Sequence, residues 1–235
     1  MTEGLENAAS AMRNKMMNIQ IVANNLANVN TTGFKRGMTF AEMLDGEQEV
    51  TTKKATDFSE GVFVETNNPL NVAISGDAFF TVKTPEGEYL TKNGDFKIDN
   101  NGYLTTREGF KVLGQNGEIN LQDELIDKNI NLAITKNGEI KSDDKIITKL
   151  KISKVENEQV LTKADGQRFY NNEKQYTIAN DNDFELYHGY LESSNTNAII
   201  EMQQMIQLQK DYEASQKMIT SIDSMMSQVK EMGKI

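Results

Sequence analysis

Few side chains in this sequence could support catalysis or metal binding. His188 is the only histidine and cysteine is absent, which excludes a histidine pair, a histidine-containing triad, a thiol nucleophile and cysteine-based metal sites. The acidic pair Asp143-Asp144 could in principle act as general acid and base, but its polar surroundings favour a solvated turn. No phosphate-binding loop, dinucleotide fingerprint or nucleophile elbow is present. We therefore expect no catalytic, cofactor-binding or metal-binding residues.

One spacing resembles a calcium-binding loop. Four residues match the third, fifth, sixth and twelfth positions of an EF-hand loop: Asp99, Asn101, Gly102 and Glu108. The first position, however, is Lys97, whose ammonium group would repel calcium. The flanking residues also alternate as strands do, whereas an EF-hand loop lies between two helices. A hairpin explains these residues without a metal, and we expect no calcium site.

The charge distribution indicates which partners the chain can have. Residues 41–189 carry 17 basic and 27 acidic groups, which accounts for the whole formal net charge of −10, while both ends are close to neutral. Phosphate binding requires clustered Lys and Arg, so nucleic acid is not expected as a partner. No apolar run reaches the roughly 18 residues that a membrane helix needs, and the N-terminus lacks a cleavable Sec signal. These features favour a cytoplasmic protein, or one exported by a route that reads no such signal.

Apolar residues recur with helical spacing at both ends of the chain. They alternate three and four residues apart from Leu5 to Val29, interrupted by Lys15, and again from Met205 to Val229, with Ser215 as the weak point. This heptad spacing predicts two long helices that pack as an antiparallel coiled-coil-like pair. The first helix is expected to stop near residues 31–33, and the second to be capped by Ser194 or Asn195.

All 12 methionines lie within residues 1–43 or 202–232. Methionine is flexible and suits surfaces that contact several neighbours, although it could also be frequent here simply because it favours helices. The remaining face of the C-terminal helix is rich in uncharged glutamine, whereas a free solvated helix usually carries more Lys and Glu. Both observations favour helices that contact other chains.

Between the ends the apolar period changes to two, as in strands. Four Asn-Gly pairs are typical of type I′ hairpin turns, in which both central residues have positive φ: Asn93-Gly94, Asn101-Gly102, Asn116-Gly117 and Asn137-Gly138. Residues 70–120 are predicted to form an antiparallel meander, residues 121–185 further β structure, and residues 41–69 an extended connector. The predicted fold class is therefore α+β, with the two terminal helices and a mainly antiparallel β middle domain.

An asparagine cluster lies near the end of the first predicted helix, at Asn24, Asn25, Asn28 and Asn30. Asparagine weakens a helix interior because its side chain competes for backbone hydrogen bonds. Amide groups both donate and accept, so these residues could bind neighbouring backbones where a charge could not be buried. They could equally cap a fraying helix end, and the residues alone leave both explanations open.

Three stretches resemble the bacterial flagellar rod and hook protein family. Residues 23–36 (ANNLANVNTTGFKR) are similar to the N-terminal signature of the family, and residues 68–80 (NPLNVAISGDAFF), followed by NGDF at 93–96, resemble its central β motif. Residues 189–195 (GYLESSN) resemble the start of its C-terminal helix, and the three stretches occur in family order. Asn71 stands where the family often has Asp, and Ala78 where Gly is usual. Residues 119–185 show no such match.

The resemblance implies a structural rod subunit, proximal or distal, rather than an enzyme. Such a subunit polymerises through its terminal helices into a helical tube that transmits torque and forms the export channel. The implied location is the periplasm-spanning rod of the flagellar basal body. The implied partners are other copies, other rod and hook proteins, the flagellar type III export apparatus and surrounding ring proteins. A short hook-type subunit is the alternative, and an envelope-binding β module with a helical oligomerisation stalk is a more distant one.

The expected division of the chain follows from these patterns and the resemblance. Residues 1–40 and 186–235 are expected to be assembly helices, residues 41–69 a connector and residues 70–185 the β-rich domain. No cofactor is expected. The assembly interface is expected to include the following residues: Met12, Met16, Ile19, Asn24, Asn25, Leu26, Asn28, Gly33, Phe34, Met205, Leu208, Tyr212, Ile219, Ile222 and Met226.

Overall fold

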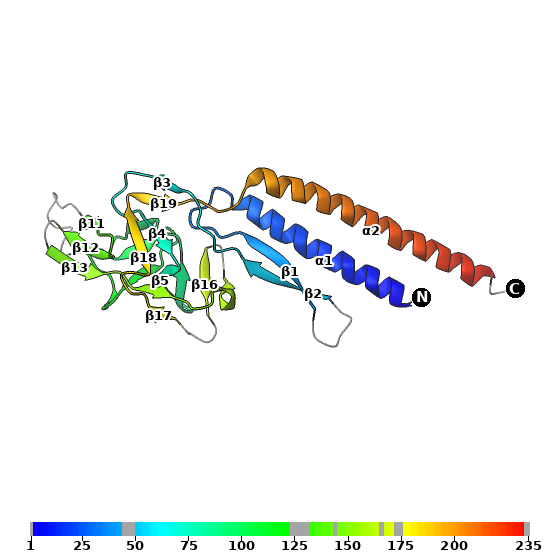
Figure 1. Ribbon diagram of the computed structural model, residues 1–235, viewed down its shortest axis with the longest axis horizontal. Coiled ribbons are helices and arrows are strands. Elements are labelled where there is room, and N and C mark those ends of the chain that lie inside the picture. The colour runs from blue at the N-terminus through cyan, green and yellow to red at the C-terminus, as the bar shows by residue number, and fades with distance from the viewer. Residues whose placement is uncertain are drawn as a thin grey trace. The chain divides into compact units, whose positions relative to one another are not determined.

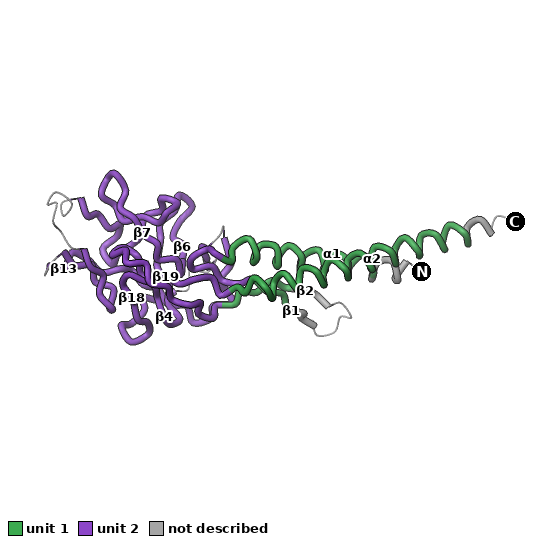
Figure 2. The backbone as a smooth tube through the Cα atoms, turned by 90° about the horizontal axis from the view of Figure 1, so that it is seen from above, with its two compact units in different colours: residues 1–29, 37–57, 196–235 green, residues 30–36, 58–195 purple. Residues whose placement is uncertain are grey.

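A computed structural model of the protein describes residues 2–43, 50–122, 132–142, 145–164, 167–171 and 176–232. The chain forms two compact units, which Figure 2 shows in different colours. Unit 1 consists of residues 1–29, 37–57 and 196–235, and unit 2 of residues 30–36 and 58–195. Each unit is therefore assembled from segments that are far apart in the sequence.

Unit 1 contains two long helices and a β-hairpin. The helices are α1 (Thr2–Ala27) and α2 (Ala198–Met232), and the hairpin strands are β1 (Gly37–Met43) and β2 (Val50–Thr56). The helices lie side by side and run in opposite directions (Figure 1). Between them, the Lys15 ammonium donates to the Asp211 carbonyl oxygen at 3.1 Å and to Ser215 Oγ at 3.0 Å. Neither helix, over its described residues, is long and apolar enough to cross a membrane.

The helix ends differ from the sequence-based expectation. Helix α1 ends at Ala27 rather than near residues 31–33, and its last turn tightens where the Asn28 amide donates to the carbonyls of both Asn24 and Asn25. Helix α2 is capped by Asn197, whose Oδ1 accepts from the amides of Ile199 and Ile200. An asparagine thus follows the last turn of α1, and another precedes the first turn of α2. The short side-chain amide of asparagine can reach the free backbone groups of a terminal turn.

The predicted fold class, α+β with the terminal helices packed as an antiparallel coiled-coil-like pair, is wrong as stated. A coiled coil buries a continuous seam of apolar side chains between its helices. Among the helical side chains that the structure describes, only Val22, Asn25 and Glu201 are buried, and two of these are polar. Helix α1 also contacts strand β1. Unit 1 is therefore two helices and a hairpin joined largely by polar contacts, and unit 2 is a mostly antiparallel β unit.

Unit 2 contains the remaining strands and one short 3-10 helix. Their bounds are β3 (Phe63–Glu65), β4 (Val72–Gly76), β5 (Ala78–Thr84), β6 (Gly87–Thr91), β7 (Phe96–Ile98), β8 (Leu104–Thr106), β9 (Lys111–Gly114), β10 (Gly117–Glu118), β11 (Leu132–Ile134), β12 (Glu139–Ser142), β13 (Lys145–Lys149), β14 (Ile152–Lys154), η2 (Glu158–Val160), β15 (Thr162–Lys163), β16 (Arg168–Tyr170), β17 (Thr177–Ile178), β18 (Phe184–His188) and β19 (Tyr190–Glu192).

The largest sheet of unit 2 joins ten of these strands by antiparallel pairing. Its order is β15-β16-β6-β5-β9-β8-β7, with β10 beside β9, and with β14 between β5 and β17. Smaller sheets comprise β11-β12-β13, β18-β4 and β19-β3. Strand β5 is central, and its successive residues Phe79 and Phe80 belong to different buried clusters because alternate side chains of a strand point to opposite faces.

The Asn-Gly turns of unit 2 are not type I′. Positive φ is found at Gly102 and Gly138, whereas Asn67 is the only non-glycine residue with positive φ in the described ranges. The Gly102 amide donates to the Asp99 carbonyl, and the Asp99 amide donates to the Tyr103 carbonyl. This is a three-residue hairpin, in which a type I turn is followed by a left-handed glycine. The Asp99 carboxylate accepts from the backbone amides of Asn101 and Tyr103 and therefore stabilises the hairpin turn.

Candidate assembly surface and its anchoring network

Helix α2 presents an unusual number of large apolar side chains to solvent. Seven of them are exposed: Ile199, Ile200, Met202, Ile206, Met218, Met225 and Val229. Met218 is 62% exposed, and Met225 and Val229 follow it at helical spacing on the same side. The glutamines of α2 are exposed as well. A soluble monomer rarely leaves an apolar surface of this kind uncovered, and such surfaces mark protein–protein contacts. We call these seven residues the α2 apolar surface.

The residues expected at the assembly interface fall into three groups. Met16 and Asn24 are exposed, and Asn25, Gly33 and Phe34 are buried within the subunit. The others are partly exposed: Met12, Ile19, Leu26, Asn28, Met205, Leu208, Tyr212, Ile219, Ile222 and Met226. Apart from Val229, the heptad positions of α2 thus lie on its less exposed side. The neighbouring row with Met218 and Met225 is more open to solvent.

The asparagine cluster divides into separate roles. The Asn25 amide group donates to the Gly37 carbonyl at 2.8 Å and to Glu201 Oε2 at 3.1 Å, and its Oδ1 accepts from the Gly37 amide at 2.8 Å. It thereby joins α1, β1 and α2 inside unit 1. The Asn28 side chain donates to the Asn24 carbonyl at 2.8 Å and so caps the helix end. Asn24 itself is exposed. Within the subunit, Asn25 therefore binds a neighbouring backbone segment, and Asn28 caps the helix end.

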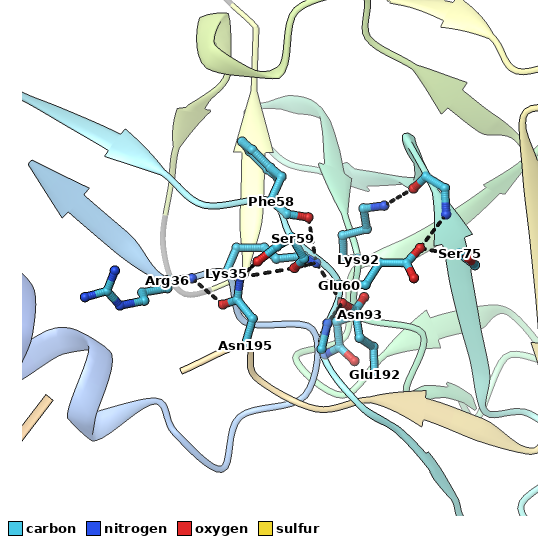
Figure 3. A network of polar contacts seen from close by, with 12 residues as sticks. Lys35, Arg36, Phe58, Ser59, Glu60, Ser75, Lys92, Asn93, Glu192 and Asn195 are labelled. Atoms are coloured by element: carbon cyan, nitrogen blue, oxygen red, sulfur yellow. Dashed lines mark hydrogen bonds and ion pairs between the residues drawn. The ribbon is translucent and has the colours of Figure 1, made fainter. Parts of the chain in front are cut away.

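A buried ion pair lies at the centre of a second polar group, in unit 2 (Figure 3). Lys35 Nζ is 2.6 Å from Glu192 Oε1, and both side chains are almost fully buried. The ammonium group also donates to the carbonyl oxygens of Ser59 at 2.8 Å and Phe58 at 3.2 Å. Glu192 Oε1 accepts in addition from the Gly61 amide at 2.8 Å. Shared hydrogen bonds of this kind offset part of the cost of removing two charges from water.

Further bonds tie the same three segments of unit 2 together. The Arg36 amide donates to Asn195 Oδ1 at 2.7 Å, and Asn195 Nδ2 donates to the Ser59 carbonyl at 3.1 Å. The Gly33 amide donates to the Glu192 carbonyl at 2.7 Å. Residues 30–36, 58–61 and 189–195 are thus held as one group, which we call the anchoring network. In the sequence, each of these segments directly adjoins residues of unit 1.

Two further lysines lie near the anchoring network: Lys92 is buried, and Lys163 is partly buried. Burial, together with the nearby charge of Lys35, lowers the pKa of Lys92 to about 8. The Lys92 ammonium donates to the Gly76 carbonyl at 2.5 Å. Burial likewise lowers the pKa of Lys163 to about 8, and this ammonium donates to the Lys35 carbonyl at 2.8 Å and lies 3.5 Å from the centre of the Phe34 ring. Both lysines are at least partly shielded from solvent in the folded chain.

Sequence analysis missed the Lys35–Glu192 pair, although both residues lie in the stretches that resemble the rod and hook family. A charged residue embedded in such a stretch, next to the apolar Phe34, was the available signal. Of the residues considered for chemistry, His188 is exposed in β18, and Asp143-Asp144 lies outside the described residues. Over the described ranges, no group of three acidic, histidine or cysteine side chains is placed to hold a metal ion.

Comparison with known proteins gives a consistent result along the chain. Three family models match: a flagella basal body rod protein model at residues 5–35, a flagellar hook protein FlgE/F/G D1 domain model at 73–142, and a flagellar basal body rod FlgEFG protein C-terminal model at 187–232. The rod protein FlgG of Buchnera aphidicola subsp. Schizaphis graminum is 30% identical, over 93% of this chain and 95% of that protein. The rod protein FlgF of Caulobacter vibrioides is also 30% identical, over 92% of each chain. The FlgG protein of Borreliella burgdorferi is 29% identical, over 96% of this chain and 97% of its own length.

Proposed function

Because this chain belongs to the flagellar basal-body rod protein family and is a structural subunit of that rod, we propose that it polymerises through its terminal helices into a helical tube. The resemblance found in the sequence motifs is thereby confirmed at the level of the family. We propose further that the tube transmits torque and encloses the export channel, and that the subunit has no catalytic role. The family is a structural one rather than an enzyme family.

The observation that carries this proposal is the α2 apolar surface. Its methionines and isoleucines are exposed on a helix that also exposes six uncharged glutamines. A contact between two different patches on identical or related chains does not close on itself, and instead propagates as a helix. We propose that this surface, with those expected interface residues of both helices that are exposed or partly exposed, contacts neighbouring subunits. Flexible methionine side chains suit a helix that meets several different neighbours.

The anchoring network supports the mechanical part of the proposal. A subunit that transmits torque must pass force between the segments that assemble and the rest of its chain. In unit 2, Lys35, Glu192 and Asn195 bind together the segments that lead into unit 1 in the sequence. Force arriving along any of these segments is therefore shared among three backbone strands rather than carried by one.

We propose that the subunit reaches the rod through the flagellar type III export apparatus and that its helical ends order only on assembly. Chains that fold on binding lose conformational entropy at that moment, and the free energy of the new contacts offsets this loss. In dilute monomer, we expect rapid amide exchange at residues 1–29 and 196–235 and slow exchange in unit 2. Equally slow exchange in all these segments of a true monomer would contradict the proposal. The proposed partners are other copies, other rod and hook proteins and surrounding ring proteins.

Replacing apolar side chains of the α2 apolar surface tests the proposed interface directly. Met218→Glu places a charge where we expect a neighbouring subunit, and Met218→Leu keeps an apolar side chain as the matched control. We expect the Glu variant to be produced and folded but missing from isolated basal bodies, and the Leu variant to be incorporated. Incorporation of the Glu variant at the level of the parent chain would overturn the assignment of this surface.

A further inference from the structure

Four Asn-Gly pairs lie in unit 2, and at each of them an intramolecular reaction of the asparagine side chain is possible. The backbone nitrogen of the residue after asparagine can attack the side-chain amide carbon. Glycine favours this attack because it has no Cβ to hinder the approach and because its backbone is free to rotate. In a folded chain, the reaction requires that the glycine can leave its native position. The four glycines can therefore be compared by what holds each of them.

The first pair, Asn93-Gly94, is held firmly. Both residues are buried, and Asn93 Oδ1 accepts from the Asp95 amide at 3.0 Å. The Gly94 carbonyl accepts from the amides of Val72 and Phe96, each at 3.1 Å. A Cβ at Gly94 would collide with the Val72 carbonyl oxygen, which shows how closely the backbones approach here.

Gly102 and Gly138 are held by the same pattern of burial and backbone hydrogen bonds. Each is buried and follows an exposed asparagine. The Gly102 amide donates to the Asp99 carbonyl at 3.0 Å, and its carbonyl accepts from the Leu121 amide at 2.7 Å. The Gly138 amide donates to the Thr135 carbonyl at 2.9 Å, and its carbonyl accepts from the Leu150 amide at 2.8 Å. Moving either glycine breaks two backbone hydrogen bonds and disturbs a packed position.

Gly117 is the exception. It is exposed, as is Asn116, and a Cβ placed on it would have no atom within 4 Å. It pairs with Gly114 at the start of β10, a strand of two residues that is bonded to β9. The end of so short a hairpin opens at little cost, because few contacts are lost.

From this contrast we propose that Asn116 is a site of spontaneous self-modification in the folded protein, whereas the other three pairs are protected. The Gly117 amide nitrogen loses its proton and bonds to Cγ of Asn116, while the bond from Cγ to the side-chain nitrogen breaks and ammonia leaves. Water then opens the resulting five-membered imide at either carbonyl. The products are aspartate and isoaspartate at position 116, each adding one negative charge to the formal net charge of −10.

The test follows all four sites in one sample. The full chain is aged in mildly alkaline buffer, either folded or unfolded in urea, and digested at acidic pH. Peptide mass spectrometry then quantifies conversion at each asparagine. In the folded chain we expect conversion at Asn116 to be at least about tenfold faster than at the other three sites. This ratio corresponds to a free energy of local opening that is about 1.4 kcal/mol higher at those three sites than at Asn116. In urea the four rates should converge, because all four asparagines precede glycine.

Two outcomes would overturn the proposal. One is conversion at Asn101 or Asn137 in the folded chain as fast as at Asn116. The other is conversion at Asn116 that is suppressed by folding as strongly as at Asn93. Asn116→Gln is the matched control, since its longer side chain closes a less favourable ring, and it should remove the main acidic species seen on ion exchange. Asn116→Asp supplies the chromatographic standard for one of the two products.

Discussion

Lys35 Nζ and Glu192 Oε1 lie 2.6 Å apart in the interior of unit 2, although the two residues are 157 positions apart in the sequence. The pair shares its polar atoms with the backbone of Ser59 and Gly61. A buried pair of this kind stabilises little relative to a well-packed apolar pair, but removing one partner leaves an uncompensated charge. Its role is therefore to specify that the three segments of the anchoring network meet. We expect the loss of one partner to lower the free energy of unfolding strongly.

The first prediction concerns this pair. Lys35→Met leaves the Glu192 carboxylate buried without its cation, and we expect a loss of about 3–5 kcal/mol in the free energy of unfolding, measured by urea denaturation. Lys136→Met is the matched control, because Lys136 forms an exposed pair with Glu185, and exposed pairs contribute little. Adding Glu192→Leu to Lys35→Met should restore part of the stability. If Lys35→Met and Lys136→Met lowered the free energy of unfolding equally, the role assigned to Lys35 would be contradicted.

The second prediction concerns pH. The pKa values of Lys92 and Lys163 are about 8 in the folded chain, against an ordinary value of 10.5, mainly because folding removes water from around the buried Lys92 and the partly buried Lys163. Between these values the unfolded chain binds more protons than the folded one, so raising the pH favours folding. We expect the free energy of unfolding to rise between pH 8 and pH 10. Lys92→Met should remove about half of this slope, since Lys163 supplies the remainder; an unchanged slope would contradict the assignment.

The third prediction concerns Asn25 in unit 1. Asn25→Leu leaves the backbone groups of Gly37 and the Glu201 carboxylate without their amide partner. We expect a loss of about 1–3 kcal/mol in stability, detected as a lower melting temperature of the helical signal in the assembled rod, where the helical ends are expected to be ordered. Asn24→Leu changes an exposed neighbour and should leave that temperature nearly unchanged. If both variants melted alike, Asn25 would not be the residue that joins α1, β1 and α2.

The fourth prediction concerns close backbone approach in the anchoring network. A Cβ at Gly61 would collide with the carbonyl oxygen of Ser193, so Gly61→Ala must push apart two segments that Lys35 and Glu192 hold together. We expect this variant to destabilise unit 2 clearly in urea denaturation. Gly109→Asn is the control, because Gly109 has open space around it and asparagine tolerates positive φ. A Gly61→Ala variant as stable as the control would show that the segments are not tightly held.

Sequence patterns anticipated some features of the structure and missed others for physical reasons. Heptad spacing indicated the helices that the structure places at residues 2–27 and 198–232, because helical periodicity is a local property. It could not show that Asn25, Glu201 and strand β1 would replace an apolar seam, since those contacts depend on segments far apart in the chain. The Lys35–Glu192 pair was missed for the same reason.

For the turns, the type was predicted wrongly although hairpins were predicted correctly. Asn-Gly indicated hairpins correctly around Gly102 and Gly138, but not their turn type, because a left-handed glycine also fits after a type I turn. The same geometry occurs without asparagine at Gly109, whose amide donates to the Thr106 carbonyl. The assembly residues stay a prediction, since a single chain does not contain its neighbours.

The central claim is that α2 contacts neighbouring subunits in the rod, and single-cysteine labelling tests it most directly. The chain has no cysteine, so Met218→Cys introduces one thiol at a side chain that is 62% exposed in the subunit. We expect this thiol to react readily with a maleimide in the purified monomer. In isolated basal bodies we expect it to be protected, and to be joined to a neighbouring rod subunit by a short photo-cross-linker attached before assembly. Equal labelling of monomer and incorporated chain, with no cross-link to a neighbour, would contradict the account.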